Sequence, residues 1–139
     1  MSEGNRSPPH ASTLRSYVKT SQAYDSSGRY GRHGNLDYQV WGYLPAHHRE
    51  SVSHSLDYAY SDWAISQVAD HLGQKEIAEC YAKASLGYQA LFDKETGSIR
   101  AKDKNGRFTE PFDSHAWGKD YAECSAIQAT LSVFHDIDV

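Results

Sequence analysis

The segment from Ser53 to Leu72 constrains the fold most strongly, because it contains neither glycine nor proline. Gly73 follows at the position where a left-handed residue commonly ends a helix. At the helical period, the apolar residues fall on two roughly opposite faces. These faces hold Val52, Leu56, Ala59 and Trp63, and Tyr58, Ile65, Val68, Ala69 and Leu72, respectively. We therefore predict a helix from Val52 to Leu72 that packs between neighbours on both sides, with Leu56 and Trp63 buried.

A second helix is predicted over Lys75–Phe92, where the apolar residues form a single stripe. The stripe consists of Ile77, Tyr81, Ala84, Tyr88, Leu91 and Phe92. Because the connection through Gly73 is very short, the two helices should lie side by side and antiparallel. One helix buried on both sides and one buried on a single side are typical of a layered helical toroid or solenoid. The predicted fold class is mainly α, built of antiparallel helical hairpins.

The N-terminal third of the chain gives weaker signals. Residues 1–12 are rich in Ser, Pro, Asn and Gly, so we predict a disordered tail there and a domain over residues 13–139. A short helix is predicted over Leu14–Tyr24. Residues Asp25–Glu50 combine scattered glycines with an aromatic cluster, which is typical of an ordered loop packed by its own side chains. The cluster consists of Tyr30, Tyr38, Trp41 and Tyr43.

The C-terminal third contains one strong turn signal, Asn105-Gly106. We predict a small β-hairpin insertion with strands over Ser98–Lys102 and Arg107–Thr109. The run that begins at Asp103 is a turn and not a calcium loop, because no Glu follows at the offset that such a loop requires. A final helix is predicted over Lys119–Phe134. Its apolar stripe is Cys124, Ile127, Leu131 and Phe134.

Composition limits the class of protein. A chain of 139 residues with 39% hydrophobic residues can form one domain with a real core, although its mean hydropathy of -0.71 indicates a polar surface. No apolar run exceeds three residues, so no membrane span is predicted. Met1–His10 lacks the apolar region of a secretory signal, and the localisation stays unknown. The net charge of -4 gives no reason to expect nucleic acid as a partner.

The two cysteines, Cys80 and Cys124, are too few for a disulfide framework. We expect both to be thiols in the core or at its boundary, with a single bridge as the alternative. Neither has the neighbours of a zinc site in sequence.

Among the acidic residues, Glu123 is the candidate for acid–base chemistry. It falls about 60° from the centre of the apolar stripe of the final predicted helix, beside Cys124. Partial desolvation of a carboxyl favours its protonated form, which suits a general acid. The alternative is a solvated residue on the flank of that helix.

Other candidate residues have ordinary explanations. Asp62 lies between the two apolar faces of the first helix, where a salt-bridged or capping carboxylate is expected. Trp117 could stack on a ligand ring, with packing in the loop as the alternative. His47 and His48 are adjacent, so on regular structure they would point apart, and we interpret them as loop histidines.

Several motifs together resemble the glycoside hydrolase family 92 α-mannosidases. They are Gly42-Tyr43-Leu44-Pro45, the run Ser51 to Trp63 (SVSHSLDYAYSDW), Leu72-Gly73, Tyr88 to Asp93 with Gly97, Tyr121-Ala122-Glu123, Gln128 and His135-Asp136. They occur in the order and approximate spacing of the family, over roughly two-thirds of the chain. The Leu-Asp-Tyr-Ala-Tyr-x-Asp-Trp part is the most specific.

The resemblance implies a partial catalytic domain of an exo-acting, calcium-dependent, inverting α-mannosidase. It implies part of an (α/α)6 toroid, a mannose-containing glycan or N-glycan as substrate, an α-1,2 linkage and calcium as the cofactor. The general acid of the family, the Glu of its Tyr-x-Glu motif, falls on Glu123. Trp117 would then be an aromatic wall for the substrate.

The chain also departs from the family pattern. Cys124-Ser125-Ala126-Ile127-Gln128 stands where the family usually has Gly-Asn-Ala-Trp-Gln. The Asn-Glu-Pro-x-His-His segment linked to calcium, the later Asp-rich base motif and the N-terminal β-sandwich are not among these 139 residues. We therefore expect a fragment that is inactive alone and that self-associates through exposed apolar surface. The alternatives are a non-catalytic helical module that binds a glycan or a protein, and another toroidal hydrolase such as a trehalase-like enzyme.

Overall fold

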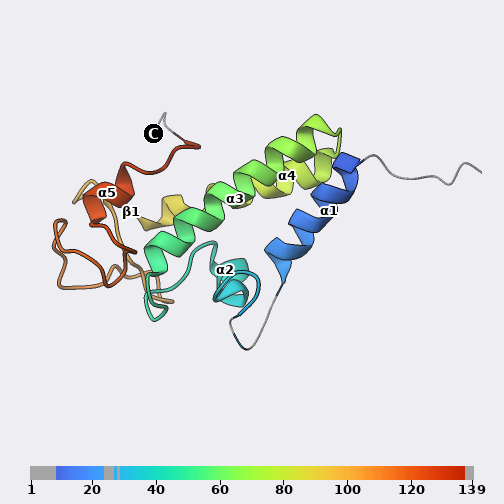
Figure 1. The fold of residues 1–139 in the computed structure, drawn as a ribbon. Helices are drawn as coiled ribbons and strands as arrows, with labels where there is room; N and C mark the ends of the chain where they lie inside the picture. Colours follow the sequence, from blue (N-terminus) through green and yellow to red (C-terminus); the bar gives the residue numbers. More distant parts are fainter. Residues whose placement is uncertain (1–8, 24–26, 28, 137–139) are drawn as a thin grey trace, which may run out of the picture.

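A computed structural model describes residues 9–23, 27 and 29–136 of the chain. Over these residues the elements are α1 (Pro9–Gln22), α2 (Asn35–Trp41), α3 (Ser51–His71), α4 (Lys75–Ala84), the 3-10 helix η1 (Gly87–Leu91), β1 (Phe92–Asp93), β2 (Ser98–Ile99) and α5 (Ala126–Thr130). The fold is mainly α with one small antiparallel sheet, as predicted (Figure 1).

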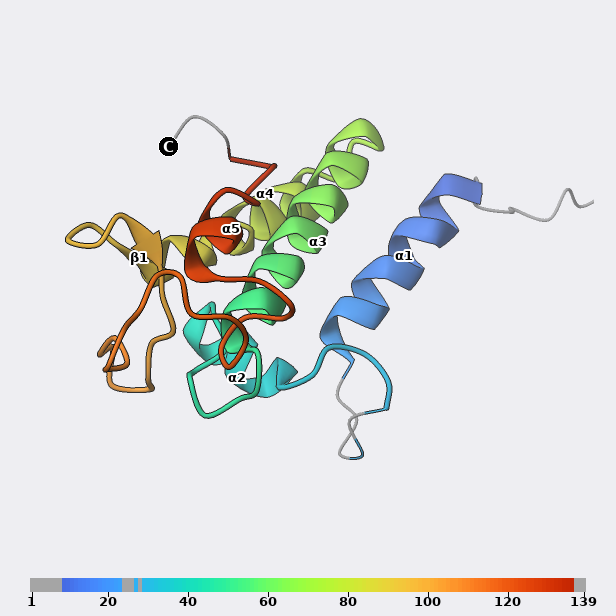
Figure 2. The ribbon, with the colours of Figure 1, turned by 60° about the vertical axis from the view of Figure 1, so that its left-hand side comes forward.

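Helix α3 is the central element and confirms the prediction of a helix packed on both sides. Figures 1 and 2 show α1 on one side of it and the C-terminal loops with α5 on the other. Val52, Leu56 and Ala59 enter one hydrophobic cluster with Tyr88, Ile99 and Tyr121 among its members. Ile65 and Ala69 enter a second cluster, which also contains Leu14, Ala78 and Tyr81. The first half of α3 therefore packs in one cluster and its second half in the other.

The end of α3 follows the predicted cap at Gly73, whose φ is 72°. The N–H of Gln74 donates to the carbonyl of Ala69, and the N–H of Gly73 donates to that of Asp70. This pair of bonds is a Schellman motif, which satisfies carbonyls that the helix end leaves free. The chain then returns along α3 as α4, and the two form the predicted helical hairpin.

The second helix is shorter than predicted, because α4 ends at Ala84 and a 3-10 helix follows. Gly87 lies against the backbone of Gly42, so closely that a side chain at position 87 would collide with it. The contact between the segments around Gly42 and Gly87 therefore determines the path of the chain after α4. Tyr88 and Leu91 are nevertheless buried, as the apolar stripe requires, while Phe92 is partly exposed and begins β1.

The β-hairpin lies one segment earlier than predicted. Phe92 pairs with Ile99 and Asp93 with Ser98, whereas the predicted strands around Asn105-Gly106 share only the bridge between Lys102 and Phe108. The buried guanidinium of Arg100 explains this choice, since it donates to Asp93 Oδ2 and to Glu110 Oε1, both at 2.8 Å. Charge-assisted bonds of this kind hold the first turn closed. The predicted turn at Asp103 is present, with Asp103 Oδ1 accepting from two backbone N–H groups.

The final helix is also much shorter than predicted. It covers only Ala126–Thr130 and begins with a capping box formed by Ser125 and Gln128. Residues 118–124 form a loop in which Gly118, Lys119 and Glu123 have positive φ. A helix cannot continue through such residues.

The N-terminal region contains two helices. Most of the predicted tail, residues 1–8, lies outside the described residues, whereas 9–12 already belong to α1, which extends the helix predicted from Leu14. The predicted loop 25–50 contains α2, with Tyr38 and Tyr43 buried and Tyr30 and Trp41 exposed. Within the described residues, no helix is both long and apolar enough to cross a membrane.

Candidate functional site

The first turn of α3 and the loop 117–124 are joined by backbone hydrogen bonds. The N–H of Glu50 donates to the carbonyl of Lys119 at 3.2 Å, and that of Val52 donates to the carbonyl of Asp120 at 3.0 Å. The N–H of Ala122 donates to Ser53 Oγ at 2.8 Å. The first N–H groups of a helix lack partners within the helix, so this loop acts as the cap of α3.

A pocket of about 570 Å³ lies between these two segments, lined by residues 46–50, residues 117–121 and Glu123. We call it the Trp117 pocket. Its volume is within the range of small-molecule sites. Larger pockets lie elsewhere, one of them along α1, but their walls are mainly apolar. The Trp117 pocket differs in its many ionisable side chains.

Residues with a strained backbone conformation line the Trp117 pocket. Among the residues that the structure describes, the non-glycine residues with positive φ are Glu50, Lys119 and Glu123, at 53°, 60° and 51°. All three line the Trp117 pocket. A non-glycine residue is uncommon in this conformation, and such residues cluster at functional sites because the surrounding structure must hold them there.

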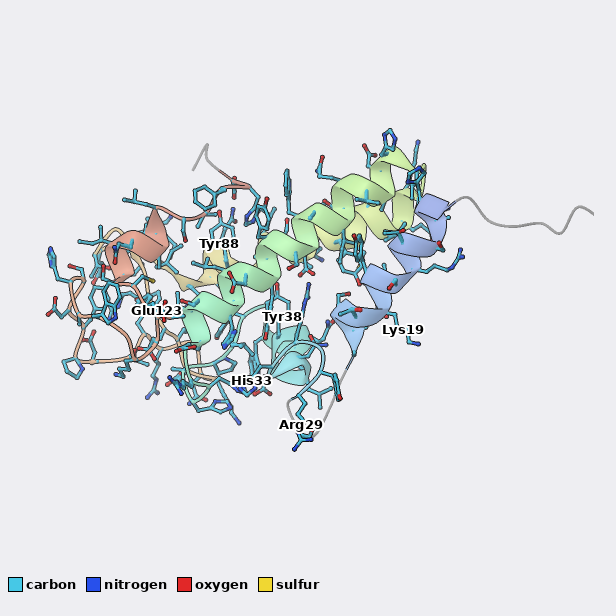
Figure 3. The ribbon with its side chains drawn as sticks, viewed as in Figure 1. Lys19, Arg29, His33, Tyr38, Tyr88 and Glu123 are labelled. Atoms are coloured by element: carbon cyan, nitrogen blue, oxygen red, sulfur yellow. The ribbon has the colours of Figure 1, made fainter. Side chains whose placement is uncertain are left out.

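Both predicted site residues, Glu123 and Trp117, line the Trp117 pocket. Figure 3 shows Glu123 among the loops near α5 and the start of α3. Trp117 is 67% exposed, which leaves its ring face available to a ligand. The predicted position of Glu123 on the edge of a helical stripe is wrong, because Glu123 precedes α5 and is exposed. Glu123 lines the pocket because it belongs to the loop 117–124.

Sequence reasoning missed two further carboxyls that line the Trp117 pocket, those of Glu50 and Asp120. Burial raises the pKa of Asp120 above its ordinary value, against a smaller opposing effect of Lys119. The next residue, Tyr121, anchors the loop, because its buried O–H donates to the carbonyl of Ile99 at 2.7 Å. The adjacency of Asp120 to the Tyr-Ala-Glu motif was the only signal in the sequence that could have identified it.

The two adjacent histidines lie outside helices and strands, as predicted. His47 and His48 lie in a turn, and their ring centroids are 4.2 Å apart. Both Nε2 atoms approach Asp37 Oδ2, at 3.2 Å for His47 and 2.7 Å for His48. The hydrogen bond with His48 lowers the pKa of Asp37. These three side chains can present ligand atoms to one ion.

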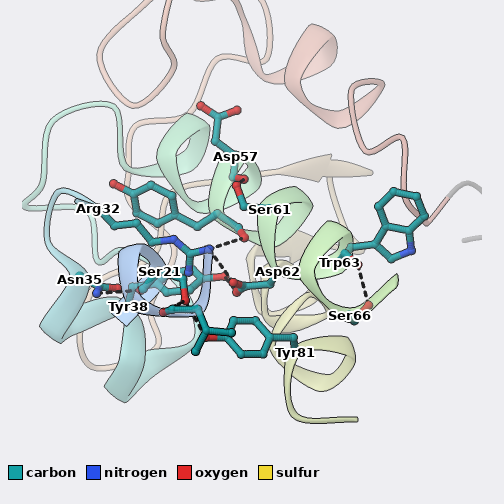
Figure 4. A network of polar contacts seen from close by, with 12 residues as sticks. Ser21, Arg32, Asn35, Tyr38, Asp57, Ser61, Asp62, Trp63, Ser66 and Tyr81 are labelled. Carbon is teal, nitrogen blue, oxygen red and sulfur yellow. Dashed lines mark hydrogen bonds and ion pairs between the residues drawn. The ribbon is translucent and has the colours of Figure 1, made fainter. Parts of the chain in front are cut away.

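Asp62 is structural, as its ordinary explanation predicted. Its carboxylate is buried and accepts bonds from Arg32 Nη2 at 2.6 Å and from the O–H of Tyr38 at 2.9 Å (Figure 4). The Arg32 guanidinium also lies over the rings of Tyr38 and Tyr58. Trp63 was predicted to be buried but is only partly so, since its neighbours are the rings of Tyr60 and His135.

The donor sets of the described residues do not fit calcium. Calcium requires six to eight oxygen ligands. The cluster that could hold an ion, Asp37 with His47 and His48, offers two imidazoles and one carboxylate. The cysteines contribute nothing to a site here, because Cys80 is exposed on α4, Cys124 is half-buried, and both are free thiols. The prediction of a core or boundary position is therefore wrong for Cys80.

Comparison with known proteins identifies one family. The sequence model of the glycosyl hydrolase family 92 catalytic domain matches residues 4–139. No curated protein matches the chain.

Solved structures similar to this chain come from the same family. The inverting mannosidase BT2199 of Bacteroides thetaiotaomicron VPI-5482 is 32% identical, with a TM-score of 0.87 over 96% of this chain and 18% of that one. The α-mannosidase BT3965 of Bacteroides thetaiotaomicron is 29% identical, with a TM-score of 0.81 over 92% of this chain and 17% of that one. A structure of BT3965 with mannoimidazole is 27% identical, with a TM-score of 0.82 and the same coverage. The chain thus spans less than a fifth of the length of these enzymes.

Proposed function

Since this chain belongs to glycosyl hydrolase family 92, we propose that it supplies the proton-donating side of an α-mannosidase active site. Glu123 is the proton donor, and Trp117 is the aromatic wall on which a mannosyl ring rests. The substrate is a mannose-containing glycan, with the α-1,2 linkage of an N-glycan as the expected case. Residues 9–136 would form one sector of a helical toroid.

One observation carries this proposal: Glu123 and Trp117 line one pocket, at the place where the left-handed residues gather. The loop is held by Tyr121 in the core and by its bonds to the start of α3. A proton donor must keep a fixed position relative to the glycosidic oxygen, so an anchored loop suits this role better than a free one.

The chemistry assigned to Glu123 is proton transfer to the oxygen of the leaving group. In an inverting reaction a second carboxylate activates a water molecule on the opposite face of the sugar, about 6.5–9.5 Å from the acid. Asp120 and Glu123 belong to one short loop, whereas the base must act from the opposite face of the sugar. We therefore assign the base, like the calcium ligands, to residues other than those of this loop.

A graft tests the assignment. Residues 4–139 replace the corresponding segment of the mannosidase that is 32% identical, and hydrolysis of α-1,2-mannobiose is measured with calcium. We expect the graft to retain hydrolysis. Glu123→Gln in the graft should lower kcat by about 10²–10⁴-fold, which is the usual contribution of general acid catalysis.

The matched control is Glu95→Gln, which changes an exposed carboxyl in the turn between β1 and β2. It should leave kcat unchanged. Full activity of the Glu123→Gln graft would contradict the proposal, and loss of activity on Asp120→Asn alone would move the acid to Asp120. A smaller graft of residues 117–124 gives the same comparison if the large one does not fold.

A further inference from the structure

We propose that Asp37, His47 and His48 form a binding site for a divalent transition-metal ion, with zinc as the expected ion. Its donor set differs from the all-oxygen set that calcium requires, and the proposal does not depend on the role of Glu123. Asp37 lies in the first turn of α2, whereas the two histidines lie in the turn before α3.

The positions of the ligand atoms fit a small tetrahedral ion. Zinc binds imidazole nitrogen and carboxylate oxygen at about 2.0–2.1 Å, so two ligand atoms on a tetrahedral ion lie about 3.3 Å apart. His47 Nε2 is 3.2 Å from Asp37 Oδ2, and His48 Nε2 is 2.7 Å from it. The contact between His48 and Asp37 has to open by about half an ångström. All three ligand atoms lie within 4.8 Å of one another.

The backbone and neighbouring residues hold the histidine side of the site before any ion binds. The N–H of His48 donates to the carbonyl of Pro45, and that of Ala46 donates to the carbonyl of Lys102. Gly34, with a φ of 63°, leaves room for the His48 ring, because a side chain there would come within 2.8 Å of His48 Cε1. The rings of His33 and His48 are perpendicular, with their centroids 5.4 Å apart.

The choice of metal follows from the donor set. Imidazole suits zinc, copper, iron and nickel, whereas calcium and magnesium prefer oxygen ligands. Two imidazoles and one carboxylate make up a known catalytic zinc set, which leaves a fourth position for water. The His47 side chain is 48% exposed and that of Asp37 is 33% exposed, so an ion and its water can reach the site.

A bound ion would connect α2 to the wall of the Trp117 pocket, because His47 and His48 are part of that wall. An ion that binds the folded chain but not the unfolded chain stabilises the folded state by mass action. Zinc should therefore raise the melting temperature. A mere hydrogen-bonded cluster of the same three side chains would not respond to zinc.

The test uses the full chain without a histidine tag, after treatment with a chelator. Zinc is titrated calorimetrically, and cobalt(II) is titrated with visible absorption as the readout. We expect one equivalent of zinc, a visible cobalt spectrum of tetrahedral type that zinc abolishes, and a higher melting temperature with zinc but not with calcium. Absence of zinc binding, or equal stabilisation by calcium, would overturn the proposal.

Substitutions locate the ion. Loss of an outer-shell partner already costs about 10–100-fold in metal affinity, so His47→Ala and His48→Ala should each cost at least as much. The matched control is His115→Ala, which removes an exposed histidine beside a single aspartate, and Cys80→Ser removes the exposed thiol. Both should bind zinc as the parent chain does.

Folding does not obscure this result. The His47 side chain is half-exposed, so His47→Ala should leave the circular dichroism spectrum unchanged. This variant is therefore informative even if His48→Ala disturbs folding. Zinc affinity that is unaltered in a folded His47→Ala chain, or that is lost in Cys80→Ser, would place the ion elsewhere and contradict the proposal.

Discussion

The N–H of Val52 donates a hydrogen bond to the carbonyl oxygen of Asp120 at 3.0 Å, across 68 positions of the chain. Val52 is fully buried in the first turn of α3, and Asp120 lies three residues before Glu123. The loop that carries the candidate acid is therefore positioned by the helix that organises the core. This connection explains how an exposed loop can hold residues in left-handed conformations.

The bond from Ala122 to Ser53 gives a direct test of that connection. Ser53→Ala removes the acceptor, so the amide of Ala122 should exchange with solvent faster. The loss in the free energy of unfolding should be about 0.5–1.5 kcal/mol, as for an ordinary hydrogen bond. Hydrogen exchange over residues 118–124 measures the effect. Ser61→Ala, which removes an exposed hydroxyl bonded within α3, should leave this exchange unchanged.

Removal of one partner from the buried pair of Arg32 and Asp62 should destabilise the fold strongly. Asp62→Asn keeps the shape of the side chain but leaves the Arg32 guanidinium buried without its counter-charge. Removal of one partner from a buried pair costs about 3–5 kcal/mol. Urea unfolding measures the change, with Asp70→Asn on the exposed face of α3 as the control. A difference below about 1 kcal/mol between the two variants would show that the pair contributes little.

The sequence predicted what depends on local pattern. The glycine-free run and Gly73 were sufficient to place α3 and its end, and the two stripes were sufficient to predict two packed faces. The end of α4 was not predictable, because it depends on the approach of Gly87 to Gly42, which are distant in sequence.

The candidate site was only partly predictable. Glu123 and Trp117 were candidates from residue type and position, and the family resemblance supplied their expected roles. The predicted helix around Glu123 was wrong because the capping box of Ser125 and Gln128, a recognisable local signal, starts the helix later. The meeting of Asp37 with His47 and His48 needs both α2 and the following turn, so no local pattern could have shown it.

The stability of the chain should depend on pH through Asp120. Burial raises its pKa in the folded chain above the ordinary value of 3.8, so the folded state binds the proton more tightly than the unfolded state. The contribution of Asp120 to the free energy of unfolding is then fully present below pH 3.8. It is lost as the pH rises through the pKa of Asp120 in the folded chain. Urea midpoints between pH 3.5 and about pH 7 measure this loss.

Asp120→Asn should remove this dependence of stability on pH. At a pH above the pKa of folded Asp120, the variant should therefore gain stability relative to the parent chain. Asp113→Asn, which changes an exposed carboxyl in the same region, is the control. A profile in which Asp120→Asn and the parent chain differ by a constant amount at every pH would contradict the assignment.

Exposed apolar side chains should make the isolated chain self-associate. Leu131 is 77% exposed and Phe134 is 70% exposed, close together at the C-terminal end. Apolar surface of this kind binds hydrophobic dyes and other copies of the chain. We expect Leu131→Lys with Phe134→Lys to lower dye fluorescence and the apparent mass in light scattering, whereas Ser132→Lys should change neither. A monomeric parent chain with low dye binding would contradict the prediction.

The isolated chain should show no measurable hydrolysis of α-1,2-mannobiose, with or without calcium. General acid catalysis by Glu123 alone is worth about 10²–10⁴-fold, whereas glycosidases combine it with a base, positioning and distortion of the sugar ring. The described residues offer no donor set that fits calcium, and we assign the base to residues outside the loop that carries Glu123. The assay compares the purified chain with its Glu123→Gln variant in the presence of calcium. Calcium-dependent turnover that disappears in the variant would show that a complete site exists in these 139 residues, with its base among the remaining carboxylates.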